Sequence, residues 1–292
     1  MADTLNHNFR WLWHRIVGAV IAGIVFVSIA GVAVAQSTRE LVLTVTPSLA
    51  RSGLLDQLVP KFEKRFRMTV KIIEQADVDG ALGLAGSGGT DLLWLSDELR
   101  ERASMKGGLT IARRDVMFGE LVLVGPKSDP AGVKGMTSLV DATRLIAAAE
   151  ARFVSRGDGS AVHRVERGVW TEAGINLPTS TKEKWYIVQK GGMRKTLETA
   201  LEKKAYTLSD RATWLGLGKT NDHMVLVNDD PRMIQQFGAL LVNPKRQKSV
   251  NAAGARAFLN WLTSKKIQKA INDFSISGEY PFTANFGHRK TN

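Results

Sequence analysis

Apolar residues follow two different spacings along the first part of this 292-residue chain. Residues 40–47, 68–75 and 90–97 carry short apolar runs that are typical of buried strands, whereas residues 52–66 repeat leucine and phenylalanine at helical spacing. This β-α-β-α-β order predicts a parallel sheet with helices on both faces. Ligands of such sheets bind beyond the carboxyl ends of the strands.

A second series of strands and helices follows a long apolar run at residues 115–132. Residues 237–244 form another long strand-like run, and residues 252–274 form an amphipathic helix with a break near Ser264. Between the two long runs, the predicted strands fall at 151–155, 184–189, 205–209 and 224–229, and the predicted helices at 160–174, 193–203 and 210–216.

Two α/β series joined by two extended connectors indicate a fold of two lobes with a cleft between them. Each lobe is expected to hold a mixed, mainly parallel sheet flanked by helices. We expect lobe I to comprise residues 36–122 and 239–292, and lobe II residues 123–238, so that the final helices return to lobe I. A two-lobed binder of this kind closes on its ligand through a few connector dihedrals.

The N-terminus has the features of a secretory signal peptide. Arg10 and Arg15 precede an apolar stretch, and the stretch ends in the Ala-Val-Ala pattern of a cleavage site at residues 33–35. We therefore predict a signal peptide at residues 1–35 and a periplasmic location for the rest. The alternative is an uncleaved membrane anchor, because about 20 apolar residues can span a bilayer.

The amino-acid composition limits the kinds of functional site that the chain can hold. The chain has no cysteine, only five scattered histidines, and a formal net charge of +12. Neither a metal site nor a cofactor is therefore expected. The positive charge favours small anions or anionic lipid as partners. Nucleic acid is not expected as a partner, because an exported protein does not meet it in the cytoplasm. A solvated basic surface explains the charge equally well. An enzyme is not expected, since Asp158, Ser160 and His163 lie in one local turn and a catalytic triad needs separate elements.

Four turns at predicted strand ends carry small polar groups or cations. They are Thr46-Pro47-Ser48, Ser96-Asp97, Ser155-Arg156-Gly157-Asp158-Gly159-Ser160 and Lys190-Gly191-Gly192-Met193-Arg194-Lys195. Hydroxyls, backbone N–H groups at helix starts and a guanidinium together suit an anion. Serine and threonine are also the preferred helix caps, so capping alone is the alternative for each turn. Arg156 has a structural alternative too, as an ion pair with Asp158 or Asp210.

The chain resembles the tungstate-binding proteins of bacterial ABC importers over nearly all of the predicted mature region. The resemblance is carried by SGLLDQLVPKFEKRF, RRDVMFGELVLVGPKSDPAGVKG, ARFVSRGDGSAVH, KWYIVQKGGMRKTL, AYTLSDRATWL and AFLNWLTS. It implies a two-lobed fold like that of periplasmic binding proteins, a tungstate or molybdate ligand, and an ABC permease as partner. The only membrane contact implied is through the permease or an uncleaved signal segment.

By position, the resemblance makes Arg156 the central anion-binding residue. The full set expected to bind ligand is Thr46, Ser48, Ser96, Ser155, Arg156, Ser160, Gly191 and Gly192. The chain departs from the family pattern at Val45, Pro47, Ala161 and Val162, which lack hydroxyls, and at three cations that we expect to alter specificity, Arg51, Arg194 and Lys195. A diverged paralogue for a larger organic anion, and a scaffold that uses its basic surface without transport, therefore stay open as alternatives.

Overall fold

The computed structural model describes residues 39–177, 184–218, 220 and 222–287. The predicted signal peptide lies outside the described residues. Among the helices that the structure describes, none has the length and apolar character needed to cross a bilayer.

The first part of the chain builds a parallel arrangement of three strands, as predicted. β1 (Arg39–Val45) lies between β2 (Met68–Glu74) and β3 (Leu92–Leu95), and both neighbours run parallel to it. The connections are helical, through α2 (Pro47–Ala50), α3 (Leu54–Phe66) and α4 (Val78–Gly86). β1, β2 and β3 therefore bring their carboxyl ends to one edge of the sheet, where ligands bind in folds of this type.

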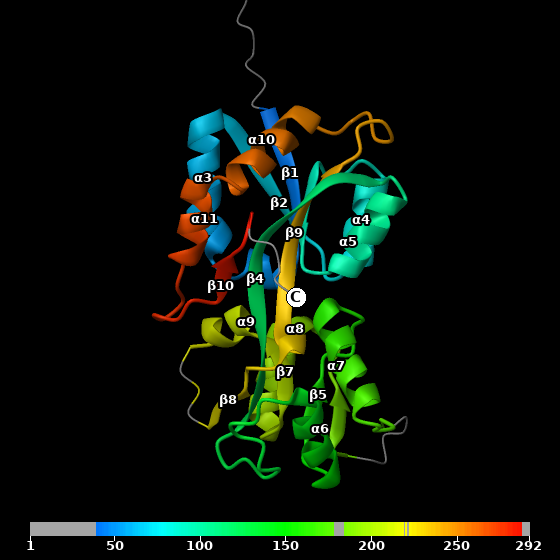
Figure 1. Cartoon of the computed structure of the whole chain (residues 1–292), viewed down its shortest axis with the longest axis vertical. Helices are drawn as coiled ribbons and strands as arrows, with labels where there is room; N and C mark the ends of the chain where they lie inside the picture. The colour runs from blue at the N-terminus through cyan, green and yellow to red at the C-terminus, as the bar shows by residue number, and fades with distance from the viewer. Residues whose placement is uncertain (1–38, 178–183, 219, 221, 288–292) are drawn as a thin grey trace, which may run out of the picture. The chain divides into compact units, whose positions relative to one another are not determined.

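Two antiparallel strands lie side by side in the main sheet, and the longer one extends through both of its halves (Figure 1). The 17-residue β4 (Thr110–Pro126) pairs with β9 (Ile234–Val242), and β9 also pairs antiparallel with β3. The second half of β4 pairs with β7 (Thr207–Asp210) and β8 (His223–Val227). The predicted extended connectors are thus strands of the sheet itself.

A second α/β series lies between the two long strands. A parallel pair of short strands, β5 (Phe153–Ser155) and β6 (Tyr186–Val188), forms its own small sheet. The helical elements of this series are α6 (Leu139–Ala148), α7 (Ala161–Glu172), α8 (Gly192–Lys203), α9 (Arg211–Gly216) and the 3₁₀ turn at Pro231–Met233. Of these, α6 had not been predicted from the sequence.

The C-terminal part packs on the first series. The predicted helix break is confirmed, because α10 (Ala252–Leu262) ends before Ser264 and α11 (Lys265–Asn272) begins after it. Phe62 of α3 has its ring centroid 4.9 Å from that of Phe258 and 5.3 Å from that of Trp261. The elements α5 (Glu98–Lys106) and β10 (Phe282–Ala284) were not predicted either.

Apolar side chains gather in two large cores. One joins residues of β1, α3, α10 and α11, and the other joins residues of β4, α6, α7 and α8. Each fully buried leucine or phenylalanine contributes about 1.5–3 kcal/mol relative to an exposed one. The chain therefore forms two packed bodies that share strand β4.

Candidate anion-binding site

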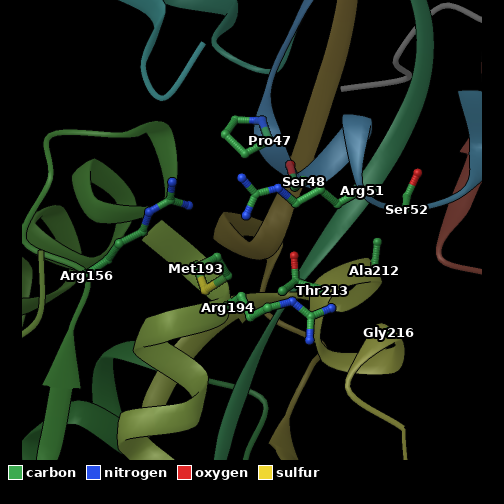
Figure 2. A pocket seen from close by; sticks show the side chains of 10 residues that line it. All are labelled: Pro47, Ser48, Arg51, Ser52, Arg156, Met193, Arg194, Ala212, Thr213 and Gly216. Carbon is green, nitrogen blue, oxygen red and sulfur yellow. The ribbon is translucent and has the colours of Figure 1, made fainter. Parts of the chain in front are cut away.

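A small pocket lies between turns that belong to the two cores (Figure 2). Its cavity volume is about 30 Å³. Such a space holds a small ion or one or two waters, whereas pockets for drug-sized molecules measure about 300–1,000 Å³. The pocket is lined by Pro47, Ser48, Arg51, Ser52, Arg156, Met193, Arg194, Ala212, Thr213 and Gly216.

The turn after β1 contributes one wall. Pro47 is the first residue of α2, where its fixed φ suits a helix and its missing N–H costs nothing. The hydroxyls of Thr46 and Ser48 lie 3.3 Å apart, although Thr46 does not line the pocket. Arg51 ends this helix and donates two hydrogen bonds to Glu74, from Nε at 3.0 Å and from Nη2 at 2.6 Å. The predicted specificity residue Arg51 therefore lines the pocket while paired to a carboxylate.

Arg156 comes from the turn between β5 and α7. Its side chain is 7% exposed, and its Nε donates to Asp158 Oδ2 at 2.5 Å. The structural alternative, an ion pair between Arg156 and Asp158, is thus present, and Arg156 also lines the pocket. Because Nε makes this bond, Nη1 and Nη2 remain to bind a ligand, and no described residue accepts a hydrogen bond from them.

Glycine shapes this turn. Gly157 has φ +61°, and a Cβ built on it would lie 2.3 Å from Cγ1 of Val188. Both features exclude larger residues at this position. Burial opposes the ionisation of Asp158, but hydrogen bonds from Ser160 and the charge of Arg156 outweigh it and hold the pKa of Asp158 below its usual value. Asp158 is therefore a carboxylate that neutralises and orients Arg156.

The two serines of this turn face the protein. Ser155 is fully buried and its Oγ donates to Glu166 Oε2 at 3.0 Å. Ser160 caps α7, and its Oγ accepts the His163 N–H at 3.3 Å. Among the expected binding residues, Ser48 and Arg156 line the pocket, whereas Thr46, Ser96, Ser155, Ser160, Gly191 and Gly192 do not. Ligand binding by these residues stays a prediction.

Residues of α8 and α9 form the rest of the pocket lining, and of these Met193 belongs to the second core and Ala212 to the first. Gly191 and Gly192 precede Arg194, which lines the pocket and has no described ion-pair partner. Lys195, the next residue, lies outside the pocket lining with its Nζ 3.9 Å from Glu198 Oε2. The sequence did not single out Met193, Ala212, Thr213, Gly216 or Ser52. Of these five residues, only Thr213 could have been recognised from the sequence, because it follows Asp210 by three residues, the spacing of a helix cap.

The charged side chains that line the pocket are all arginines, two of them paired with carboxylates outside the lining. Three guanidinium groups approach it from three elements, those of Arg51, Arg156 and Arg194 (Figure 2), and no carboxylate is among its ten lining residues. The buried Asp210 holds the N–H and hydroxyl of Thr213, each at 2.8 Å, and its burial raises its pKa. No group of three or more His, Cys, Asp or Glu residues that could hold a metal occurs in the described part of the chain. The arrangement can bind an anion through charge-assisted hydrogen bonds.

Comparison with known proteins gives the family. The model of the PBP superfamily domain matches residues 33–266. The tungstate-binding protein TupA of Peptoclostridium acidaminophilum is 34% identical over 242 residues, which are 82% of this chain and 82% of the relative. The chain belongs to the PBP superfamily, in the TupA family. Its fold is therefore the two-lobed fold that the sequence predicted.

Solved structures of the TupA family agree. The tungstate-binding protein TupA from Desulfovibrio alaskensis G20 has a TM-score of 0.74 and 35% identity, covering 85% of this chain and 99% of that one. A structure described as the tungstate ABC transporter from Geobacter sulfurreducens has a TM-score of 0.73 and 32% identity, covering 80% and 98%. The match to the PBP superfamily domain, residues 33–266, includes every residue that lines the pocket.

Proposed function

We propose that this protein is an exported solute-binding protein that captures tungstate, or the related oxyanion molybdate, and delivers it to an ABC permease. The single observation that carries the proposal is a small pocket with three guanidinium groups and no lining carboxylate. Relatives that are named as tungstate-binding proteins support tungstate as the first ligand. Binding and release need no chemical step, so the proposed role includes neither enzymatic activity nor a cofactor.

The proposed ligand contacts centre on Arg156. Its free Nη1 and Nη2 would donate to oxyanion oxygens, with Ser48 and Arg194 completing the set. The limited volume of the pocket supports a tetrahedral ion over a larger organic anion. Residues 1–35 as a signal peptide would place the protein in the periplasm, and the lobe boundaries at residues 122–123 and 238–239 belong to the same proposal.

A thermal-shift screen of the purified protein tests this function. The panel contains tungstate, molybdate, sulfate, phosphate and several organic phosphates. A ligand at 100 times its Kd stabilises a protein by about 2.7 kcal/mol, and we expect such a shift with tungstate or molybdate. Arg156→Gln should abolish the shift, whereas Arg144→Gln, which changes an exposed arginine paired with Asp141, should retain it. A shift with an organic phosphate alone would refute the proposal.

A further inference from the structure

Behind the Arg156 turn lies a buried carboxyl group that the proposed binding does not use. Glu166 of α7 is 4% exposed. Its Oε2 accepts the Ser155 hydroxyl at 3.0 Å, and its Oε1 accepts the Tyr186 hydroxyl at 2.7 Å. The backbone N–H of Arg156 also donates to it. No cation pairs with Glu166 among the described residues, although buried glutamates are usually paired.

This environment makes Glu166 titratable near neutrality. Burial raises the pKa of Glu166 to about 6, against the hydrogen bonds from Tyr186, Ser155 and Arg156, which lower it. A carboxyl group in this position changes charge within one or two pH units of neutral. It does so in contact with Ser155, the last residue of β5, and with Arg156, the next residue, which carries the guanidinium of the pocket.

We infer that Glu166 is a positioning residue whose protonation strengthens oxyanion binding at the Arg156 turn. The inference rests on the proposed function. Ionised Glu166 can only accept hydrogen bonds, so the Ser155 hydroxyl continues to donate to it. Its negative charge also opposes the binding of a second anion nearby. Protonated Glu166 can instead donate to Ser155 Oγ. The negative charge that opposes an anion near the Arg156 turn is then gone.

Linkage gives the sign of the effect. If the protonated form binds the oxyanion more tightly, the bound oxyanion must in turn favour protonation of Glu166 by the same factor. The protein should therefore take up a fraction of a proton when it binds at pH 7. Affinity should rise as pH falls toward 6 and should level off below that value, where Glu166 is already protonated.

Other ionisable groups around the turn must be separated from Glu166. Asp158 has a lowered pKa and stays charged throughout this pH range. Asp210 of β7 is buried with a raised pKa. On α7 itself, burial lowers the pKa of His163, so it gains charge only on the acid side. On β6, Tyr186 has a pKa raised by burial and by Glu166, so it stays neutral. A variant at Glu166 leaves these other groups in place and isolates its share.

The test is isothermal titration of tungstate and molybdate into wild-type protein, Glu166→Gln, Glu172→Gln and His163→Gln between pH 5.5 and 8.5. Glutamine resembles protonated glutamate in shape and in its ability to donate. Glu172 lies on the same helix, half exposed and paired with Arg232, and serves as the matched control. Protonation of the oxyanion itself cancels in the ratio of variant to wild-type affinity.

We expect wild-type affinity to fall roughly fivefold between pH 6 and 8, the change given by a pKa of about 6 that rises by about one unit on binding. Glu166→Gln should bind at pH 8 as tightly as the wild type does at pH 6, and it should lose the proton uptake seen on comparing two buffers. Glu172→Gln and His163→Gln should keep the wild-type slope. A wild-type slope in Glu166→Gln would overturn the inference.

Failure of the proposed function has a different signature. If neither the wild type nor any variant binds tungstate or molybdate at any pH, the function is wrong and the inference falls with it. Tyr186→Phe offers a second route if Glu166→Gln does not fold. It removes one donor from ionised Glu166, so the decline in affinity should begin at higher pH. An unchanged midpoint in Tyr186→Phe would overturn the positioning role.

Discussion

Arg164 of α7 forms a salt bridge with Asp97, the residue that caps α5 just after β3. The Asp97 side chain is 7% exposed and also accepts the Arg100 N–H at 3.2 Å, while the other amino group of Arg164 donates to the Gly159 carbonyl. The bridge therefore connects the carboxyl end of a strand in the first sheet with the turn that carries Arg156. It spans the two bodies beside the proposed binding site.

Removal of this bridge should weaken the contact between the two bodies. We expect Arg164→Gln to release tungstate roughly fivefold faster, the factor for about 1 kcal/mol, and to lower the free energy of unfolding by about 1 kcal/mol or less. Stopped-flow measurement of ligand release tests this prediction. Arg144→Gln, which breaks an exposed pair within α6, is the control and should leave release unchanged. Equal release rates in both variants would show that the bridge does not slow ligand release.

Two adjacent cations at the start of α8 allow a direct comparison. Arg194 lines the pocket without a described ion-pair partner, whereas Lys195 lies outside the lining beside Glu198. Arg194→Ala should weaken oxyanion binding by about 1.5–3 kcal/mol, the contribution of a hydrogen bond to a charged group. Lys195→Ala should change affinity little, because solvent screens its charge. Titration calorimetry at one salt concentration distinguishes them, and equal losses would mean that only the general basic charge matters.

The tungstate-binding proteins that this chain resembles usually have a threonine at the position of Pro47. Pro47 lines the pocket. Pro47→Thr should tighten tungstate binding by about 0.5–1.5 kcal/mol through a new hydroxyl donor. It should also lower stability by about 0.4–1 kcal/mol, because proline restricts the unfolded chain. Pro130→Thr, in an exposed loop, should show the stability change alone. If Pro47→Thr leaves affinity unchanged, the turn after β1 does not contact the ligand.

Sequence periodicity predicted most of the fold because it reports burial directly. The apolar spacing of residues 52–66 and the break at Ser264 correspond to α3 and to the gap between α10 and α11. Helix α5 escaped detection because it is short, mostly polar, and buries Glu101 and Ser104 in place of an apolar stripe. β10 has three residues and depends on its pairing with β4, which no local pattern reveals.

The site was less predictable, because side-chain partners depend on residues far apart in sequence. The position of Arg156 at a strand end was readable, and so was its possible pairing with Asp158. In contrast, the bond from Ser155 to Glu166 crosses from β5 to α7, and the pair between Arg51 and Glu74 joins residues 23 positions apart. Both contacts depend on how the elements pack. The sequence therefore identified Ser155 and Arg51 as candidates but did not identify their partners.

The strand β4, which both large cores share, has a consequence for how the protein unfolds. β4 contributes Val116 and Met117 to one core and residues 121–124 to the other. If the two bodies separated, the backbone hydrogen bonds of β4 would break or one of the two cores would be exposed to solvent. We therefore expect both bodies to melt in a single cooperative transition in calorimetry. A fragment that ends inside β4 should fail to fold alone, so that gene truncations at this point yield no half-sized product with native structure.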